Sequence, residues 1–194
     1  MNKLVVIIGF ALSVFIMSSC NQQSTQLDEA TKKEWLTKGK QATKTLSAAL
    51  LKQLSGQIKE SGTVAAINYC NLNALAITDS ISEVLGVKIS RVSHRNRNPN
   101  NKANTYELTL IEDYSSKLAA NKATTTTLYT EKTQNTFYAP IIMGIPTCLK
   151  CHGNTEADIE PEVLQVISKK YPADKATGFK MGELRGLFKV EFEK

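Results

Sequence analysis

The sequence predicts an α+β domain with an antiparallel sheet, and two observations support this fold class. Helical patterns fill the first half of the chain, whereas most strand patterns gather in the second half. Such segregation is typical of α+β domains rather than of alternating parallel folds. The composition agrees with one globular domain, since 42% of the 194 residues are hydrophobic and 22% are charged.

Two helical patterns follow one another from residue 28. Asp28 opens the first, because an acidic side chain suits the positive end of a helix, and apolar residues then recur at helical spacing until Gly62. Thr63 can cap a second helix, which Gly86 closes. Two shorter helices are expected over residues 106–119 and 162–171.

Strand patterns occupy residues 87–93, 124–130, 137–143 and 187–192. The second and third of these are close enough in sequence to form a hairpin. Residues 95–104 hold Pro99 and five Asn, a composition typical of a loop.

The N-terminal segment has the features of an export signal. Lys3 precedes an apolar run over residues 4–16, which is shorter than the roughly 20 residues that a membrane-spanning helix needs. Met17-Ser18-Ser19-Cys20 resembles the lipobox of bacterial lipoproteins, although the first position there is usually Leu. We therefore expect a lipoprotein signal peptide over 1–19, lipid attachment at Cys20 and a polar tether over 20–27. The alternative is an ordinary secretory signal.

These features predict a protein of the bacterial cell envelope, anchored to a membrane and facing the periplasm or the exterior. The formal net charge is +6, but the 24 Lys and Arg are spread along the whole sequence without a basic block. A nucleic-acid partner is therefore not expected.

A C-x-x-C-H string is the clearest chemical signal. In Cys148-Leu149-Lys150-Cys151-His152, two thiols can reach the two vinyl groups of a porphyrin, and the adjacent imidazole can bind iron. A zinc ribbon would need a second ligand pair, and a thioredoxin-like motif would sit near the start of its domain. The motif predicts one covalent haem c, attached at Cys148 and Cys151 with His152 as an iron ligand.

The second iron ligand has four candidates in the sequence: Cys70, His94, Met143 and Met181. Cys70 lies on an apolar helical pattern and is the one thiol left once lipid and haem take the others. The alternative is a small, buried and inert side chain.

Several motifs together resemble the PAS-like c-type haem domain family. They appear in this order: Ala66-Ile67, Cys70, Ala74, Arg91-x-Ser93, Arg97-Asn98-Pro99-x-Asn101, Glu107, Pro140-Ile141, the haem motif followed by Gly153, and Gly182-Glu183-Leu184-Arg185-Gly186. The resemblance spans roughly residues 30–193 and implies a PAS-like domain over 28–194, with a long N-terminal helix and flanking helices. It also implies that Cys70 is the second axial ligand. His94 departs from the family, which usually has an apolar residue there.

The arginine-rich loop offers candidates for the haem propionates. Arg97, Asn98 and Asn101 match the family motif, and a guanidinium group fits carboxylate geometry. The alternative is surface charge on an ordinary turn.

The function expected from these features is electron transfer or redox sensing with an unknown protein partner. A haem-based gas sensor that signals through a partner protein is the alternative. A haem enzyme such as a peroxidase is expected least, because Cys70 would occupy the iron face that substrate needs.

Overall fold

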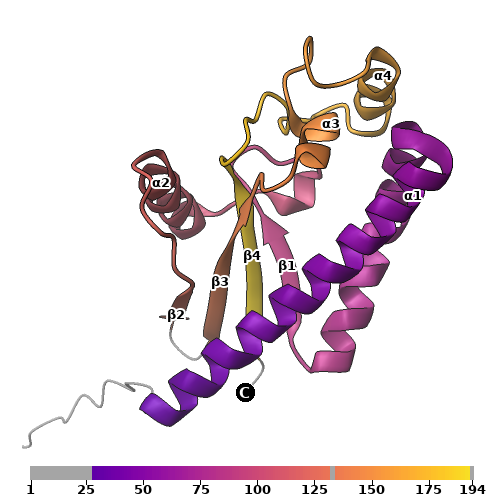
Figure 1. Ribbon diagram of the computed structural model, residues 1–194. Helices are drawn as coiled ribbons and strands as arrows, with labels where there is room; N and C mark the ends of the chain where they lie inside the picture. Colours follow the sequence, from indigo (N-terminus) through magenta and orange to yellow (C-terminus); the bar gives the residue numbers. More distant parts are fainter. Residues whose placement is uncertain (1–27, 132–133, 193–194) are drawn as a thin grey trace, which may run out of the picture.

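The computed structural model describes residues 28–131 and 134–192, so the predicted signal and the whole predicted tether, including Cys20, lie outside the described residues. Within that part, no helix is both long enough and apolar enough to cross a membrane. The helices are α1 (Glu29–Leu85), α2 (Thr105–Ala119), α3 (Leu149–His152) and α4 (Pro161–Lys170), and the strands are β1 (Lys88–Val92), β2 (Thr127–Glu131), β3 (Gln134–Ile142) and β4 (Leu184–Phe192). Figure 1 shows α1 beside the sheet, with α3 and α4 beyond one end of the strands. The predicted α+β class with a long N-terminal helix is confirmed.

The long helix α1 folds back on itself. Asp28 caps its start by accepting a hydrogen bond from the Thr31 amide at 2.9 Å, and Gly86 ends it in the left-handed conformation. Gly62 interrupts it with φ 81° and ψ 176°, values that favour glycine. The second segment runs back beside the first, and Tyr69 Oη donates to Gln53 Oε1 at 3.3 Å across the bend. The predicted break at Gly62 is confirmed.

The sheet is antiparallel throughout, with the order β1-β4-β3-β2. The expected hairpin is present, because β2 pairs with β3. The last strand begins three residues earlier than predicted. Leu184 pairs with Ile142 beyond a register shift in β3, and this irregular pairing hides the start of β4 from an alternation pattern.

Each face of the sheet is covered by a different helix. The α1 face packs Ala42 and Leu46 against Phe137 and Val190, and all four are buried. On the opposite face, α2 packs against Tyr138 and Leu187 through the buried side chains of Leu110, Ile111 and Tyr114. This two-sided core leaves one end of the sheet to carry α3 and α4 (Figure 1).

Gly39 sits where α1 approaches the sheet most closely. A Cβ atom there would lie 2.6 Å from the Phe137 Cδ atoms, inside van der Waals contact. Gly39→Ala is therefore expected to lower the free energy of unfolding by about 1–3 kcal/mol, as overpacking does. The measurement is urea unfolding followed by circular dichroism.

Gly56 provides the matched control in the same helix. A Cβ atom there would meet nothing within 4 Å. Gly56→Ala should therefore raise the free energy of unfolding by about 0.5–1 kcal/mol, through helix propensity alone. If both variants change stability in the same direction, the close packing of α1 against Phe137 is wrong.

Candidate functional site

The C-x-x-C-H motif forms a short turn of helix at one end of the sheet. Residues 146–148 form a 3₁₀ turn that leads directly into α3, with Pro146 at its first position. Cys148 is half-buried and Cys151 is buried. Gly153 then ends α3, and a Cβ atom there would lie 2.6 Å from Asp158 Oδ2. The chain can therefore turn tightly enough to hold both thiols and the imidazole together.

His152 is held in one tautomer. Its Nδ1 lies 2.7 Å from the Ala176 carbonyl oxygen. A carbonyl can only accept, so Nδ1 carries the proton and Nε2 keeps its lone pair in the neutral ring. The backbone carbonyl of His152 accepts from the Phe179 amide at 2.9 Å, and the two rings meet edge to face. This geometry presents Nε2 as a metal ligand.

The surroundings of His152 favour its neutral form. Burial lowers the pKa of His152 well below its usual value, and the positive charges of Arg185 and Arg97 lower it further. The hydrogen bond to Ala176 opposes this only in part. A neutral imidazole is the form that binds a metal.

Arg97 links the motif to Asp174 through hydrogen bonds and so holds it in place. Its Nη2 donates to the Cys151 carbonyl oxygen at 2.6 Å, and its Nε and Nη2 each lie 3.1 Å from a different oxygen of Asp174. Asp174 Oδ1 also accepts from the Ala176 amide at 3.0 Å. The Arg97–Asp174 pair therefore fixes the position of Ala176, whose carbonyl oxygen orients His152.

This arrangement revises the role expected for Arg97. Its guanidinium group already serves Asp174 and Cys151, so it positions the motif rather than standing ready for a propionate. Asn98 and Asn101 also have local tasks. Asn98 Oδ1 accepts from the Asn100 amide at 3.0 Å, and the Asn101 carbonyl accepts from the Ser93 amide at 2.8 Å. The side chain of Asn98 and the backbone of Asn101 therefore help to shape the loop.

Cys70 lies next to the motif although 78 residues separate it from Cys148 in sequence. One turn before it, Ile67 packs in an apolar cluster with Cys151 and Val163. Burial raises the pKa of Cys70, and the nearby charge of Arg91 opposes that rise. Burial also raises the pKa of Cys151 to about 11, with smaller contributions from the charges of Cys70 and Cys148. The fold thus gathers the thiols of Cys70, Cys148 and Cys151 in one region.

The other candidates for a second ligand have different surroundings. Met143 is 1% exposed and packs with Ala176 and Phe179 in a cluster that also touches Cys148 and Leu149 of the motif. Met181 is 44% exposed in the turn before β4. His94 is also exposed, with its ring edge toward Phe179. Of the four side chains, Cys70 is the one whose charge acts on the pKa of Cys151.

Two further arginines lie against the ring of Phe179. The guanidinium carbon of Arg95 lies 3.8 Å from the ring centroid, and that of Arg185 lies 5.3 Å away. Arg185 Nη1 also donates to Ser93 Oγ and to the Arg95 carbonyl, both at 3.0 Å. Burial and the charge of Arg97 lower the pKa of Arg185 to about 10. Burial also lowers the pKa of Arg91, and the charges of Cys70 and Tyr171 oppose that shift. Arg91, Arg95 and Arg185 together form a positive cluster that suits an anionic ligand.

The donor set fits an iron porphyrin better than a bare metal ion. Among the described residues, no group of three or more His, Cys, Asp or Glu side chains comes together in a way that would hold a metal. A porphyrin supplies four nitrogens itself, so its iron needs only one or two ligands from the chain. Among the residues described above, His152 and Cys70 could supply such ligands, and Cys148 and Cys151 could supply attachment thiols.

Sequence reasoning missed Asp174, Ala176 and Phe179. None of them belongs to a local motif, and each acts on residues 24 to 85 positions away in the sequence, such as His152, Arg97 and His94. In the sequence, Arg185 stands out only as part of the motif Gly182-Glu183-Leu184-Arg185-Gly186. The one available signal was the spacing of Arg91, Arg95 and Arg97 along a single segment.

The brace between Arg97 and Asp174 gives a direct test of the site. Both side chains are about 10% exposed, at 11% and 10%. Arg97→Met should therefore lower the free energy of unfolding by about 3–5 kcal/mol, because it leaves a buried carboxylate without its partner. Equilibrium urea unfolding measures the loss.

Lys117→Met is the control for a lost ion pair. Lys117 lies 2.6 Å from Asp113, but their side chains are 39% and 47% exposed. Its loss should cost no more than about 0.5 kcal/mol. A similar small effect in both variants would contradict the bracing role of Arg97.

Comparison with known proteins identifies one family and one solved structure. A family model for Tll0287-like proteins matches residues 19–192. The crystal structure of the cyanobacterial heme-protein Tll0287 is similar, with a TM-score of 0.62 and 19% sequence identity, over 87% of this chain and 98% of that one. At this identity the likeness shows the fold. No curated protein matches the chain.

Proposed function

Because this chain belongs to the Tll0287-like family, whose model covers residues 19–192, we propose that it is a c-type haem protein. The solved relative is described as a heme-protein. The observation that carries the proposal is the C-x-x-C-H turn, in which the Ala176 carbonyl leaves Nε2 of His152 available for iron. Cys148 and Cys151 are the proposed thioether residues, and one haem is proposed per chain.

In this proposal, different side chains have different roles around the haem. The haem supplies one-electron chemistry at its iron when bound. His152 binds the iron, and Arg97 with Asp174 holds that ligand in place. We assign the propionates to the positive cluster of Arg91, Arg95 and Arg185 instead of Arg97, because the charge of Arg97 is already paired with the carboxylate of Asp174.

Cys70 is the proposed second axial ligand. Its helix packs on the cluster that contains Cys151, and its thiol and Arg91 influence each other electrostatically. A cysteine binds iron as thiolate, and a positive neighbour favours that form. The negative charge favours ferric over ferrous iron, so the reduction potential should be low compared with that of a methionine-ligated cytochrome.

Electron transfer or redox sensing follows from two axial ligands supplied by the chain. Such an iron has no free position for substrate, which disfavours an enzyme such as a peroxidase. The alternative is a gas sensor, in which a diatomic ligand displaces Cys70. Absorption spectra of the reduced protein with and without carbon monoxide separate these functions: an unchanged spectrum supports electron transfer, and ready displacement supports sensing.

The covalent bond is tested by denaturation. Haem should remain with the wild-type polypeptide in denaturing gels, because unfolding does not break thioether bonds. Cys148→Ser and Cys151→Ser should weaken or abolish that retention. Cys70→Ala is the matched control and should keep its haem on the gel, since Cys70 supplies only a coordinate bond. Zinc in place of iron, or an apo protein from cells able to mature cytochromes c, would refute the haem assignment.

Ferric-state electron paramagnetic resonance tests the axial thiolate. The wild type should give a low-spin signal with the narrow g-spread of thiolate ligation, and Cys70→Ala should lose it. Met181→Leu is the control and should leave the spectrum unchanged. A Cys70→Ala spectrum identical to that of the wild type would exclude this ligand and favour Met181 or His94 instead.

Attachment to the membrane is proposed through Cys20, which lies outside the described residues. The support is the apolar run over residues 4–16 followed by Ser18, Ser19 and Cys20. The mature chain should partition into detergent, and Cys20→Ser should block processing or release the protein. A soluble mature protein whose first residue is not Cys20 would contradict the anchor.

A further inference from the structure

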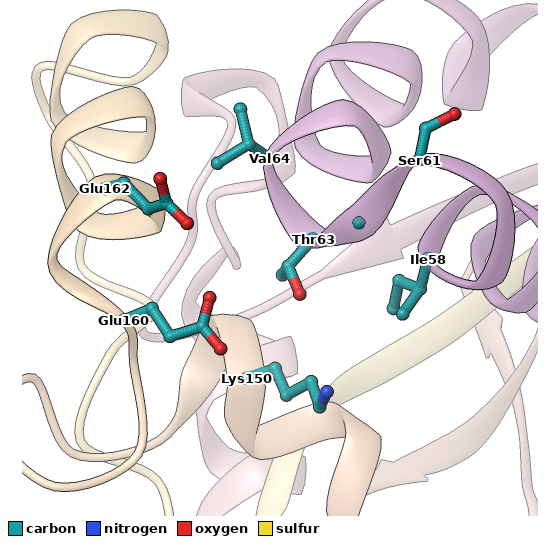
Figure 2. Close-up of a pocket in the computed structure, with 8 residues that line it drawn as sticks. Ile58, Ser61, Thr63, Val64, Lys150, Glu160 and Glu162 are labelled. Atoms are coloured by element: carbon teal, nitrogen blue, oxygen red, sulfur yellow. The ribbon is translucent and has the colours of Figure 1, made fainter.

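A pocket of about 450 Å³ lies where the bend of α1 meets α3 and the start of α4. Figure 2 shows Lys150 below the bend, with Glu160 and Glu162 on the side of α4. None of the thiols or imidazoles of the proposed haem site lines it. The pocket is therefore separate from that site, although it borders it through Lys150 of the C-x-x-C-H motif and through Val64, which packs on the cluster that contains Cys151.

The walls of the pocket carry opposite charges. Lys150 contributes an ammonium group on one side, and Glu160 and Glu162 contribute two carboxylates on another. Among the described residues, none of these three side chains takes part in an ion pair within 4.0 Å. Glu160 also makes no capping hydrogen bond at the start of α4. The charges are thus available to a ligand that carries both signs.

Thr63 supplies the observation that points to a ligand. The residue is only 9% exposed, yet no hydrogen bond joins its hydroxyl group to any other described residue. Figure 2 shows this oxygen pointing into the pocket, toward the Lys150 side. Because the oxygen faces the pocket and has no partner among the described residues, it is free to make a hydrogen bond with a polar group bound there.

The bend at Gly62 places the start of the second segment of α1 in the same wall, and the start of a helix carries a partial positive charge. Gly62 has non-helical backbone angles, and the segment of α1 that follows begins with Thr63. A helix start attracts carboxylates through its dipole. Ile58 and Val64 add apolar surface beside it. One wall therefore suits a carboxylate, the other suits an ammonium group, and the apolar residues suit a short hydrocarbon side chain.

We propose that this pocket binds a small zwitterion of the free α-amino acid class. Its carboxylate would lie by Thr63 and Lys150, and its ammonium group by Glu160 and Glu162. A simple anion is disfavoured by the two glutamates, and a simple cation by Lys150 and the helix start. A zwitterion can pair with the charges on both walls. The charges that select it, on Lys150, Glu160 and Glu162, have no role in the proposed haem site.

Isothermal titration calorimetry of the full-length, haem-loaded protein tests the proposal with L-leucine, acetate and methylammonium as probes. L-leucine should bind saturably, whereas acetate and methylammonium should each bind at least about 10-fold more weakly. Thr63→Val should weaken L-leucine binding by about 10-fold, the size of one hydrogen bond to a charged group. Thr63→Ser should keep it, because the hydroxyl group remains.

Variants on the acidic wall complete the experiment. Glu160→Gln combined with Glu162→Gln should weaken L-leucine binding by at least about 10-fold. Glu156→Gln is the matched control, since Glu156 is exposed and lies outside the pocket, and it should bind like the wild type. Thermal unfolding of each variant checks that it is folded.

Three outcomes would overturn the proposal: no saturable binding up to about 10 mM L-leucine, equal affinity for acetate alone, or unchanged affinity in folded Thr63→Val. The haem absorption spectrum recorded on the same samples keeps the two proposals apart. A normal spectrum without binding would remove the amino-acid site and leave the haem assignment intact.

Discussion

The buried ion pair between Arg97 and Asp174 is the interaction on which the rest of the site depends. It joins three segments that are far apart in sequence: the loop after β1, the end of α3 and the connection before β4. Burying two charges is costly, and such pairs are weak evidence for added stability. Here the pair fixes a geometry, because the carboxylate also holds the Ala176 amide and so sets the carbonyl that faces His152.

The same end of the molecule concentrates positive charge. Three arginines, Arg95, Arg97 and Arg185, lie near His152 or Phe179, and among the described residues only Arg97 forms an ion pair, with Asp174. Burial lowers the pKa of Arg185, and repulsion from the charges of Arg97, Arg91 and Arg95 lowers it further. An excess of buried guanidinium groups is tolerable where a ligand brings negative charge, and the two carboxylates of a haem would do so.

Local features of the fold could be predicted from sequence, whereas features that depend on distant partners could not. The bend at Gly62 and the C-x-x-C-H turn were predictable, because a glycine or a short spacing encodes them directly. The start of β4 was not, since Leu184 pairs beyond a register shift. Arg97 was assigned to a propionate because its partner, Asp174, lies 77 residues away and has no motif of its own.

The order of the strands has a consequence for how the chain matures. β4 is the last strand in sequence but lies inside the sheet, between β1 and β3. β1 has no other neighbour in the sheet, so it stays unpaired until residues 184–192 have been synthesised. The two segments of α1 can pair early, but the sheet beneath them closes only once residues 184–192 are available. Until then Phe137 lacks its strand partner Val190, and apolar surface exposed in this way is prone to aggregation.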